Sequence, residues 1–304
     1  MRYYLAPLEG ITTYIYRNAV CEYFGDGIDK YFTPFFGPDT KRSRDSRDIQ
    51  GILPEHNPGQ HLVPQILTLD ADDYFKFEKD IKEYGYKEAD INFGCPSGTV
   101  TGKGRGSGAL LHPGDIDRFL YEVYSKTDIK VSVKTRIGWA DPAEWPAILD
   151  VYNRYPVSEL IVHPRVKTEM YKGAIHKDVY RWTEAHTDIP LCLSGDVKSV
   201  SDAAWLAGSG TAAVMVGRGM VADPSLIRQL AGGEPASRQE LKDFMNKLLN
   251  DYIGLYPAEQ PVLFKMKEIW SYMGSMYPGR EKQVKQIFKA KTVTEYRSAV
   301  AAVL

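Results

Sequence analysis

The chain has 304 residues, of which 43% are hydrophobic and 25% charged, and this composition excludes extensive disorder. The length exceeds what one hydrophobic core usually serves, so we expect a large domain with a smaller appendage. The formal net charge of −1 is unevenly divided, because residues 235–304 carry 11 Lys and Arg against 7 Asp and Glu, whereas residues 1–234 carry 27 against 32. The basic C-terminal part permits a polyanionic partner.

Nothing in the sequence suggests a membrane protein. The chain begins MRYYLAPLEG, without the apolar stretch of a signal peptide, and no segment approaches the roughly 20 apolar residues of a membrane span. We therefore expect a cytoplasmic protein without a membrane partner, and we expect it to be a monomer.

Short β-rich runs alternate with helical segments through the first three quarters of the chain, which is the pattern of parallel βα units. The runs that we expect to be strands are residues 3–6, 29–33, 62–65, 89–92, 130–133, 160–162, 191–193 and 213–216. Segments 70–84 and 113–124 place apolar side chains three to four residues apart, as amphipathic helices do. Eight such units in about 230 residues favour a TIM (β/α)8 barrel over a doubly wound open sheet.

Two stretches interrupt this alternation. Residues 34–60 are rich in Arg, Asp, Pro and Gly and form the longest segment without an expected element, and loops of that length are often functional. After residue 230 a Gly- and Pro-containing run ends the pattern, and helical periodicity without strands follows from Leu241 onward. We expect residues 1–232 to form the barrel and residues 237–304 to form a C-terminal all-helical domain.

Reactive side chains follow seven of the eight expected strands. In a barrel of parallel strands, the residues just beyond the C-terminal strand ends build the active site. The residues at these positions are Pro7, Leu8, Glu9, Gln65, Asn92, Cys95, Lys134, His163, Arg165, Ser194, Gly195, Asp196, Gly217 and Arg218. Their concentration at one end of the expected barrel predicts an enzyme.

The turns after the seventh and eighth expected strands predict a phosphate site. Ser194-Gly195-Asp196 and Gly217-Arg218-Gly219 expose backbone N–H groups toward an anion, and Arg218 adds a positive charge. One such turn is typical of an ordinary loop, but two on neighbouring strands indicate a phosphorylated ligand.

Gln65 and Lys134 suit the pyrimidine edge of a flavin. Gln65 offers a donor and an acceptor, and Lys134 offers a cation that stabilises negative charge at N1 and O2 of the reduced ring. A lysine in this position also fits Schiff-base formation, as in aldolases, and this alternative stays open.

The three cysteines lie in different surroundings, and their odd number without paired spacing predicts neither a disulfide framework nor a metal site. Cys21 lies in an amphipathic segment and Cys192 in an apolar strand, as packing residues do. Cys95 lies in Asn-Phe-Gly-Cys-Pro-Ser-Gly, where Gly and Pro favour an exposed loop. A thiol is mostly protonated at neutral pH, so Cys95 suits a general acid as well as a nucleophile.

These motifs resemble the dihydrouridine synthases over nearly the whole chain. The resemblance rests on residues 6–12, 92–97, the Gly-rich run to residue 111, 133–139 and 163–165. The segment Asn-x-Gly-Cys-Pro is the most specific of these motifs.

The resemblance implies an FMN-bound barrel, a helical RNA-binding domain and NADPH, or NADH, as the reductant. It also implies that hydride passes from reduced flavin to C6 of a uridine, giving 5,6-dihydrouridine, while Cys95 protonates C5 and Asn92 lies against the base. Arg165 and Tyr171 are implied near the incoming nucleotide. The implied FMN contacts are Pro7, Leu8, Glu9, Gln65, Lys134, His163, Ser194, Gly195, Asp196, Gly217 and Arg218.

The sequence departs from the family pattern at two places. Ser194 stands where an asparagine is usual, and a hydroxyl can replace an amide as a flavin contact. Residues 97–100 lack a lysine that many members carry, which leaves the uridine position open and admits rRNA beside tRNA as the substrate.

An RNA substrate requires a binding surface beyond the pocket, because extruding a uridine from folded RNA costs a few kcal/mol. Basic side chains of the C-terminal part are spaced like a helix surface that binds phosphates, namely Lys265, Lys267, Arg280, Lys282, Lys285, Lys289 and Lys291. Trp270, Tyr272 and Tyr277 are expected in the core, and Lys103 and Arg105 fit phosphate contacts and solvated charges equally. Two other functions stay open: an FMN oxidoreductase of a small pyrimidine or other small molecule, and a non-catalytic RNA-binding protein.

Overall fold

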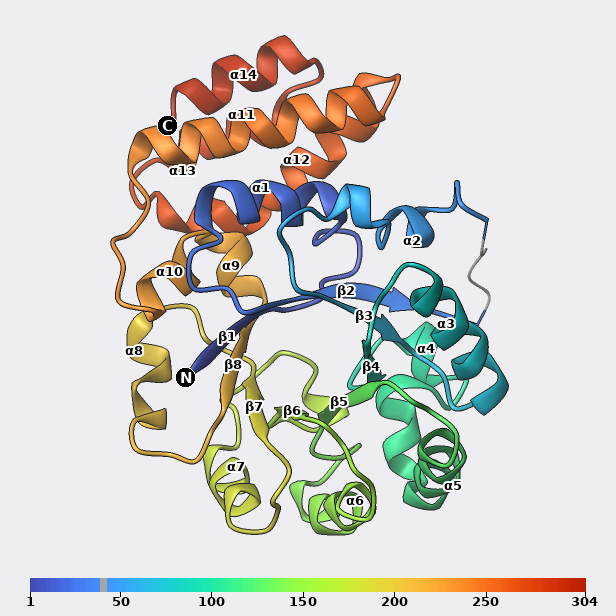
Figure 1. Cartoon of the computed structure of the whole chain (residues 1–304). Helices are drawn as coiled ribbons and strands as arrows, with labels where there is room; N and C mark the ends of the chain where they lie inside the picture. The colour runs from blue at the N-terminus through green and yellow to red at the C-terminus, as the bar shows by residue number, and fades with distance from the viewer. Residues whose placement is uncertain (39–42) are drawn as a thin grey trace.

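The computed structural model describes residues 1–38 and 43–304. Its eight parallel strands form a closed barrel in which each strand pairs with the next and the last pairs with the first (Figure 1). The strands are β1 (Arg2–Leu5), β2 (Lys30–Phe36), β3 (Leu62–Ile66), β4 (Glu88–Phe93), β5 (Lys130–Arg136), β6 (Leu160–His163), β7 (Leu191–Ser194) and β8 (Ala213–Val216). The predicted (β/α)8 barrel is therefore confirmed.

Helices surround the barrel, and their ends follow local sequence signals. Asp70 accepts a hydrogen bond from the backbone N–H of Asp73 and caps α3, and Pro113 occupies the first turn of α5, where its missing N–H costs nothing. The helices between the strands and directly after β8 are α1 (Tyr14–Phe24), α2 (Arg47–Gln50), α3 (Ala71–Glu83), α4 (Gly98–Thr101), α5 (Pro113–Tyr124), α6 (Trp145–Tyr152), α7 (Lys177–Glu184), α8 (Val200–Ala203), α9 (Arg218–Ala222) and α10 (Leu226–Leu230). The apolar stripes of α3 and α5 are buried against the barrel, as their spacing predicts.

Alternation along the strands separates two apolar layers. In β4, Ala89, Ile91 and Phe93 belong to the large cluster between strands and helices, so Asp90 and Asn92 face the barrel interior. A smaller cluster fills the interior, formed by Tyr4, Ala6, Phe32, Val63, Ile161, Cys192, Ala213 and Met215. The barrel is thus packed inside, and polar side chains such as Asn92 and Lys134 lie at the C-terminal strand ends beside the cavity described below.

The segment over residues 34–60, which was expected to lack regular structure, contains short elements. Strand β2 continues to Phe36 through an irregularity between Phe32 and Phe35, and a bulge tolerates Pro34 because the unpaired backbone there needs no N–H. The segment also contains α2 and a 3-10 turn at Pro54–His56, while residues 39–42 lie outside the described residues. The prediction of an uninterrupted loop was therefore wrong at its start.

A buried arginine fixes the end of this segment. Arg17 of α1 donates to the carbonyl oxygens of Thr12 and Gly51 and to Oδ1 of Asn57, at 2.8, 2.5 and 2.8 Å. Burial lowers the pKa of Arg17 to about 10, so the side chain stays protonated at neutral pH. The guanidinium ties the segment before β3 to α1.

Four helices follow the barrel and confirm the predicted helical C-terminal region: α11 (Arg238–Leu255), α12 (Glu259–Met273), α13 (Glu281–Lys289) and α14 (Val293–Ala301). Figure 1 shows them gathered on the side of the barrel that carries α1 and α9. A capping box between Ser237 and Glu240 starts α11. The ring of Phe244 contacts those of Tyr16 and Phe24, with centroids 6.0 and 5.4 Å apart. One continuous core therefore joins the helices to the barrel.

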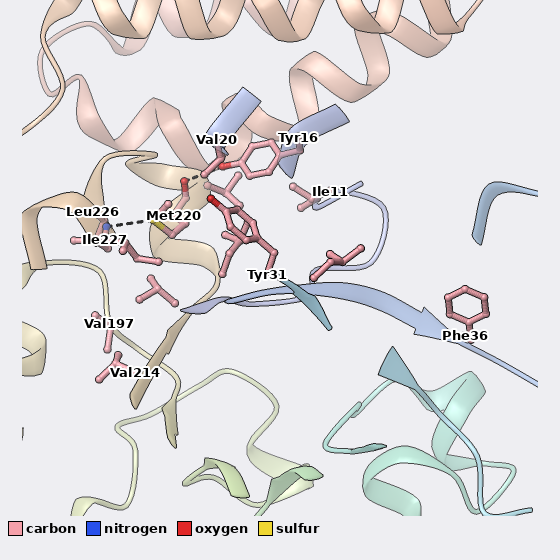
Figure 2. Packing of buried hydrophobic residues seen from close by; sticks show 14 of the residues in the cluster. Ile11, Tyr16, Val20, Tyr31, Phe36, Val197, Val214, Met220, Leu226 and Ile227 are labelled. Atoms are coloured by element: carbon pink, nitrogen blue, oxygen red, sulfur yellow. Dashed lines mark hydrogen bonds between the residues drawn. The ribbon is translucent and has the colours of Figure 1, made fainter. Parts of the chain in front are cut away.

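Figure 2 shows the packing on the barrel side of this junction. Tyr16 from α1 lies beside Val20 and donates its hydroxyl to the carbonyl oxygen of Met220 at 2.8 Å. Leu226 and Ile227 from α10 pack near Met220, below the C-terminal helices. The segment directly after β8, which carries part of the predicted site, is thereby anchored.

Candidate active site

A cavity of about 370 Å³ opens among the C-terminal ends of the strands. It brings together the predicted residues Pro7, Leu8, Glu9, Gln65, Asn92, Cys95, Lys134, His163, Tyr171, Ser194, Gly195, Asp196, Gly217 and Arg218. Arg165 is the one predicted site residue that does not line it. Side chains from elements that span more than two hundred residues of sequence thus meet in one pocket.

The loop after β4 holds Cys95 rigidly at the cavity wall. Asn92 Oδ1 accepts from the backbone N–H groups of Gly94 and Cys95, both at 2.9 Å. Ser107 donates its N–H and its hydroxyl to the Cys95 carbonyl at 3.0 and 2.9 Å. Gly106 has a φ of +55°, and a Cβ there would lie 2.8 Å from the same carbonyl oxygen, so only glycine fits. These contacts fix the half-buried thiol at the cavity wall.

Cys95 is held as a thiol. Burial raises its pKa, against the opposing effects of the Ser97 backbone N–H and the positive charges of Lys134 and Arg136. At neutral pH the side chain is protonated, which favours the role of an acid over that of a nucleophile.

Gln65 and Lys134 lie on the same side of the barrel mouth as Asn92. Gln65 Oε1 accepts from Asn92 Nδ2 at 2.8 Å. Lys134 lies within β5, not beyond it as predicted, because the strand extends to Arg136. Burial lowers the pKa of Lys134, and within residues 1–38 and 43–304 no hydrogen bond or ion pair satisfies its ammonium group. A cation facing a cavity without a protein partner suits an acceptor atom on a ligand.

His163 is neutral at physiological pH. Burial lowers its pKa well below the usual range, and the charges of Arg136, Lys134, Arg165 and Arg218 act in the same direction. The ring packs against the backbone of Gly195, where a Cβ would lie 2.6 Å from His163 Cδ2. These cations make the cavity electropositive, as an anionic ligand requires.

The turns after β7 and β8 lie against each other. Asp196 Oδ1 accepts from Arg218 Nη2 at 3.0 Å. A Cβ on Gly219 would lie 2.2 Å from the carbonyl oxygen of Val197, so the close approach of the two turns requires glycine at this position. Lys198 lines the cavity next to these turns. The predicted phosphate turns are therefore adjacent in space and carry positive charge.

Arg165 lies outside the cavity, behind the turn after β7. It is fully buried, and its donors reach the carbonyl oxygens of Lys172 and Gly173, the carboxylate of Asp196 and, at 3.3 Å, His163 Nε2. The expectation that Arg165 lies beside an incoming nucleotide does not fit this burial. Its charge was visible in the sequence, but the partner that buries it comes from the next βα unit.

Tyr171 covers the cavity edge between two arginines. The guanidinium groups of Arg136 and Arg218 lie 5.2 and 4.6 Å from its ring centroid, and the His163 ring stacks at 6.2 Å. The side chain is 49% exposed. An aromatic ring held by cations and open to solvent offers a stacking face for a heterocycle.

A family model described as Dihydrouridine synthase (Dus) matches residues 4–301. The chain belongs to the dihydrouridine synthase family. It is 30% identical to tRNA-dihydrouridine(16) synthase of Cupriavidus necator over 249 residues, covering 78% of this chain and 77% of the relative. It is 28% identical to tRNA-dihydrouridine synthase B of Pasteurella multocida over 229 residues, covering 75% and 68%.

Solved structures show the same fold at low sequence identity. Morphinone reductase superposes with a TM-score of 0.54 at 11% identity, over 78% of this chain and 87% of that one. Family membership makes this chain a flavin-dependent oxidoreductase. The cavity fits such a cofactor, because it combines two glycine turns, a surplus of positive charge and the ammonium of Lys134, which makes no hydrogen bond to residues 1–38 and 43–304.

Among the cavity residues that were not predicted, three have polar side chains, namely Arg136, Lys198 and Tyr272. Arg136 lies two residues after Lys134 on the same strand face, so the period of two could have found it. Lys198 carries no distinctive sequence signal. Tyr272 belongs to α12 and was expected in the core, yet it lines the cavity, which only the packing of the C-terminal helices on the barrel reveals.

Two kinds of feature are missing from the described part of this synthase. Among residues 1–38 and 43–304, no three His, Cys, Asp or Glu side chains gather as a metal ion would need. The same residues contain no helix that combines the length and the apolar character needed to cross a membrane.

Proposed function

We propose that this chain reduces uridine in tRNA to 5,6-dihydrouridine, with FMN as its flavin and NADPH, or NADH, as the reductant. The observation that carries the proposal is a protonated thiol, Cys95, on a pinned loop in the same cavity as Lys134 and Gln65. Names of relatives that specify tRNA-dihydrouridine synthesis support tRNA over rRNA. Residues 1–232 would form the catalytic barrel and residues 237–304 the RNA-binding domain.

The residues for FMN divide between two walls of the cavity. Gln65 and Lys134 would hold the pyrimidine edge of the ring system, where a cation favours the reduced state. The turns at Gly195 and Gly217, with Arg218 and Lys198, would hold the phosphate. When reduced, the bound flavin supplies the hydride that adds to C6 of uracil.

Cys95 completes the reaction by protonation. Hydride addition at C6 builds enolate-like charge on the base, and the Cys95 thiol donates its proton at C5. The thiolate left behind is stabilised by the Ser97 N–H and by Lys134 and Arg136, the same groups that oppose the rise in its pKa. Cys95 is thus protonated before it donates its proton, and its thiolate is stabilised afterwards.

The base would be positioned by Asn92 and Tyr171. Asn92 is fixed at both ends of its amide, by Gln65 and by two backbone N–H groups, and it borders the cavity next to Cys95. Tyr171 presents its ring where the uracil enters. Stacking on an aromatic ring contributes about 1–3 kcal/mol per base, comparable to the few kcal/mol needed to extrude a uridine.

The C-terminal region would bind the RNA backbone with part of the predicted basic set. Lys265 donates to Gly10 O, Lys267 to Ala290 O and Arg280 to Ala302 O, so these three hold the fold together. Lys282, Lys285, Lys289 and Lys291 are positioned on the outside and remain suited to phosphates. The charge surplus of this region is therefore concentrated on and after α13.

The proposal is tested by incubating the purified chain with FMN, NADPH and unmodified tRNA or rRNA, then mapping dihydrouridine by sequencing. We expect dihydrouridine at one or a few tRNA positions and none in rRNA. If only rRNA is modified, the substrate is rRNA and not tRNA. Reduction of free uridine or uracil without RNA would favour the small-molecule oxidoreductase. A yellow protein that reduces none of these would contradict the proposal.

A further inference from the structure

A buried carboxylate lies directly beneath the proposed site. Asp90 is in β4, two residues before Asn92, and its side chain is fully buried in the barrel interior. Its Oδ2 accepts from Gln65 Nε2 at 2.7 Å, and its Oδ1 accepts from Ser132 Oγ at 2.6 Å. A buried carboxylate is stabilised only when its oxygens are satisfied, and here both oxygens have a donor.

Asp90 begins a continuous series of hydrogen bonds that ends at Cys95. Gln65 donates to Asp90 and accepts from Asn92 at 2.8 Å. Asn92 in turn accepts from the Cys95 backbone N–H at 2.9 Å. Four residues from two strands and one loop thus form one directed chain. It links the predicted flavin contact to the predicted acid.

The two ends of this chain permit only one orientation of its amides. Burial raises the pKa of Asp90 to about 7, so above that pH the side chain is a carboxylate, which accepts and does not donate. Gln65 must then turn its NH2 group toward Asp90 and its oxygen toward Asn92. A backbone N–H donates and does not accept, so Asn92 must turn its oxygen toward Cys95. Both ends therefore require the same direction, and neither amide can flip without losing a buried hydrogen bond.

The charge of Asp90 also acts on Lys134 in the neighbouring strand β5. Burial lowers the pKa of Lys134, and Asp90 is the largest influence that opposes this effect. In the strand register Asn92 lies opposite Lys134, and Asp90 lies opposite Ser132. The carboxylate is thus placed to hold Gln65 by geometry and Lys134 by charge.

We propose that Asp90 is a positioning residue that sets the direction of the Gln65 amide and through it holds the Asn92 amide, so that one buried carboxylate helps to align the flavin contact and the Cys95 loop. This inference rests on the proposed function for the identity of the flavin contact and the acid. The orientation of the Cys95 loop follows from the hydrogen bonds of the protein alone.

Three variants test the orientation by a double-mutant cycle. Loss of the Ser132 hydrogen bond raises the pKa of Asp90 further, so all variants are measured well above pH 7. There the carboxylate in Ser132→Ala still only accepts, and the series of hydrogen bonds keeps its direction. In Asp90→Asn the introduced amide can keep its oxygen toward Gln65, because its NH2 can donate to Ser132. In the double variant nothing fixes the amide introduced by Asp90→Asn, so it can turn its NH2 group toward Gln65. The backbone N–H groups of Gly94 and Cys95 still hold the oxygen of Asn92, so Gln65 must then lose its hydrogen bond either to residue 90 or to Asn92.

Two measurements report on the two functional groups that the series of hydrogen bonds joins, the flavin contact and Cys95. FMN affinity of the apoprotein is measured by fluorescence titration, and Cys95 accessibility by the rate of iodoacetamide modification at Cys95, read by peptide mass spectrometry. We expect Ser132→Ala to stay within about threefold of wild type in both measurements, and Asp90→Asn, which also removes the charge that acts on Lys134, to do so only in the Cys95 rate. The double variant should bind FMN about tenfold more weakly than Asp90→Asn and react at Cys95 several-fold faster than either single variant.

The inference is overturned if the fold-changes of the double variant equal the product of the fold-changes of the two single variants. It is also overturned if the double variant changes FMN affinity without changing the Cys95 modification rate, or the reverse. Should the double variant fail to fold, Gln65→Leu breaks the chain at its middle, and an unchanged Cys95 modification rate in that variant overturns the inference equally. Both Cys95 measurements use apoprotein without RNA. A failure of the proposed function, seen as wild-type protein that modifies no tRNA, is therefore distinguishable from a failure of the role of Asp90.

Discussion

The two walls of the cavity are built by different physical means. On the β3 to β5 wall, Asp90, Gln65 and Asn92 are joined by directed hydrogen bonds from strand positions. On the β6 to β8 wall, Asp196 joins Arg165 from the loop after β6 and Arg218 from the start of α9. Directed amides fix orientation, whereas ion pairs supply charge with looser geometry. The first wall suits the reacting atoms, and the second suits a phosphate.

The largest expected effect is on the acid of the first wall. We expect Cys95→Ala to retain yellow colour and FMN affinity but to lose about 10²- to 10⁴-fold in the rate of dihydrouridine formation, because a positioned acid contributes about that much. Cys21→Ala, which changes a cysteine outside the cavity, is the matched control. Full activity of Cys95→Ala would remove the proposed acid.

The same thiol determines a pH dependence. The acid must be protonated, and burial raises the pKa of Cys95, so the rate of dihydrouridine formation should remain level as the pH rises through about 8.5, the ordinary thiol value, and fall only above it. The measurement is the single-turnover rate of pre-reduced enzyme with tRNA, taken from about pH 6 to about pH 10 so that the range brackets the ordinary thiol value. A decline that begins below neutral pH would contradict a thiol of raised pKa.

The next effect concerns the cation of the first wall. Lys134→Met should weaken FMN binding by about 10- to 100-fold, because it removes a charge-assisted contact to the ligand from a buried position. Lys130→Met, at the exposed start of the same strand, is the control and should bind FMN like wild type. If borohydride traps a covalent adduct on Lys134 instead, the residue is a Schiff-base lysine and the flavin assignment is wrong.

The sequence identifies the first wall better than the second, and the reason is physical. Gln65, Asn92 and Lys134 lie on strands whose alternation and apolar neighbours determine which way they face. Cys95 lies in a loop whose Gly and Pro residues indicate its exposure. Local sequence therefore contains the information needed for this wall.

The second wall depends on contacts that local sequence does not contain. Arg165 follows a strand as an active-site residue would, but it is buried by Asp196, 31 residues further along the chain. Tyr272 reaches the cavity because Phe244 and Lys265 dock the C-terminal helices against α1 and Gly10. Such placements follow from tertiary packing, which periodicity alone cannot give.

A smaller effect distinguishes the second wall from the first. Arg218→Gln should weaken FMN binding by about three- to tenfold at low salt, and the difference from wild type should shrink as salt is raised, because Arg218 is partly exposed and screened. The effect of Lys134→Met, in contrast, should change little with salt. Arg118→Gln, on the outer helix α5, is the control. Equal salt dependence of the two walls would contradict the division between them.

The smallest expected effects lie outside the cavity, on α13. Val284 and Ile287 pack this helix against the core, which leaves Lys282, Lys285 and Lys289 on its outer side. Each Lys→Ala change should weaken tRNA binding a few-fold and reduce the slope of log K against log salt by about 1, because one phosphate contact is lost. The rate at saturating tRNA should stay at the wild-type value, since these residues are remote from Cys95.

Lys76→Ala on α3 provides the control for α13, because it removes a lysine from a helix on the outside of the barrel. If the α13 variants and this control lower tRNA affinity equally, the effect is one of net charge and α13 has no special role. If only the α13 variants change the salt slope, the phosphates lie along this helix. The tRNA would then run from the C-terminal region to the cavity past Tyr272, the one side chain of α12 that lines it.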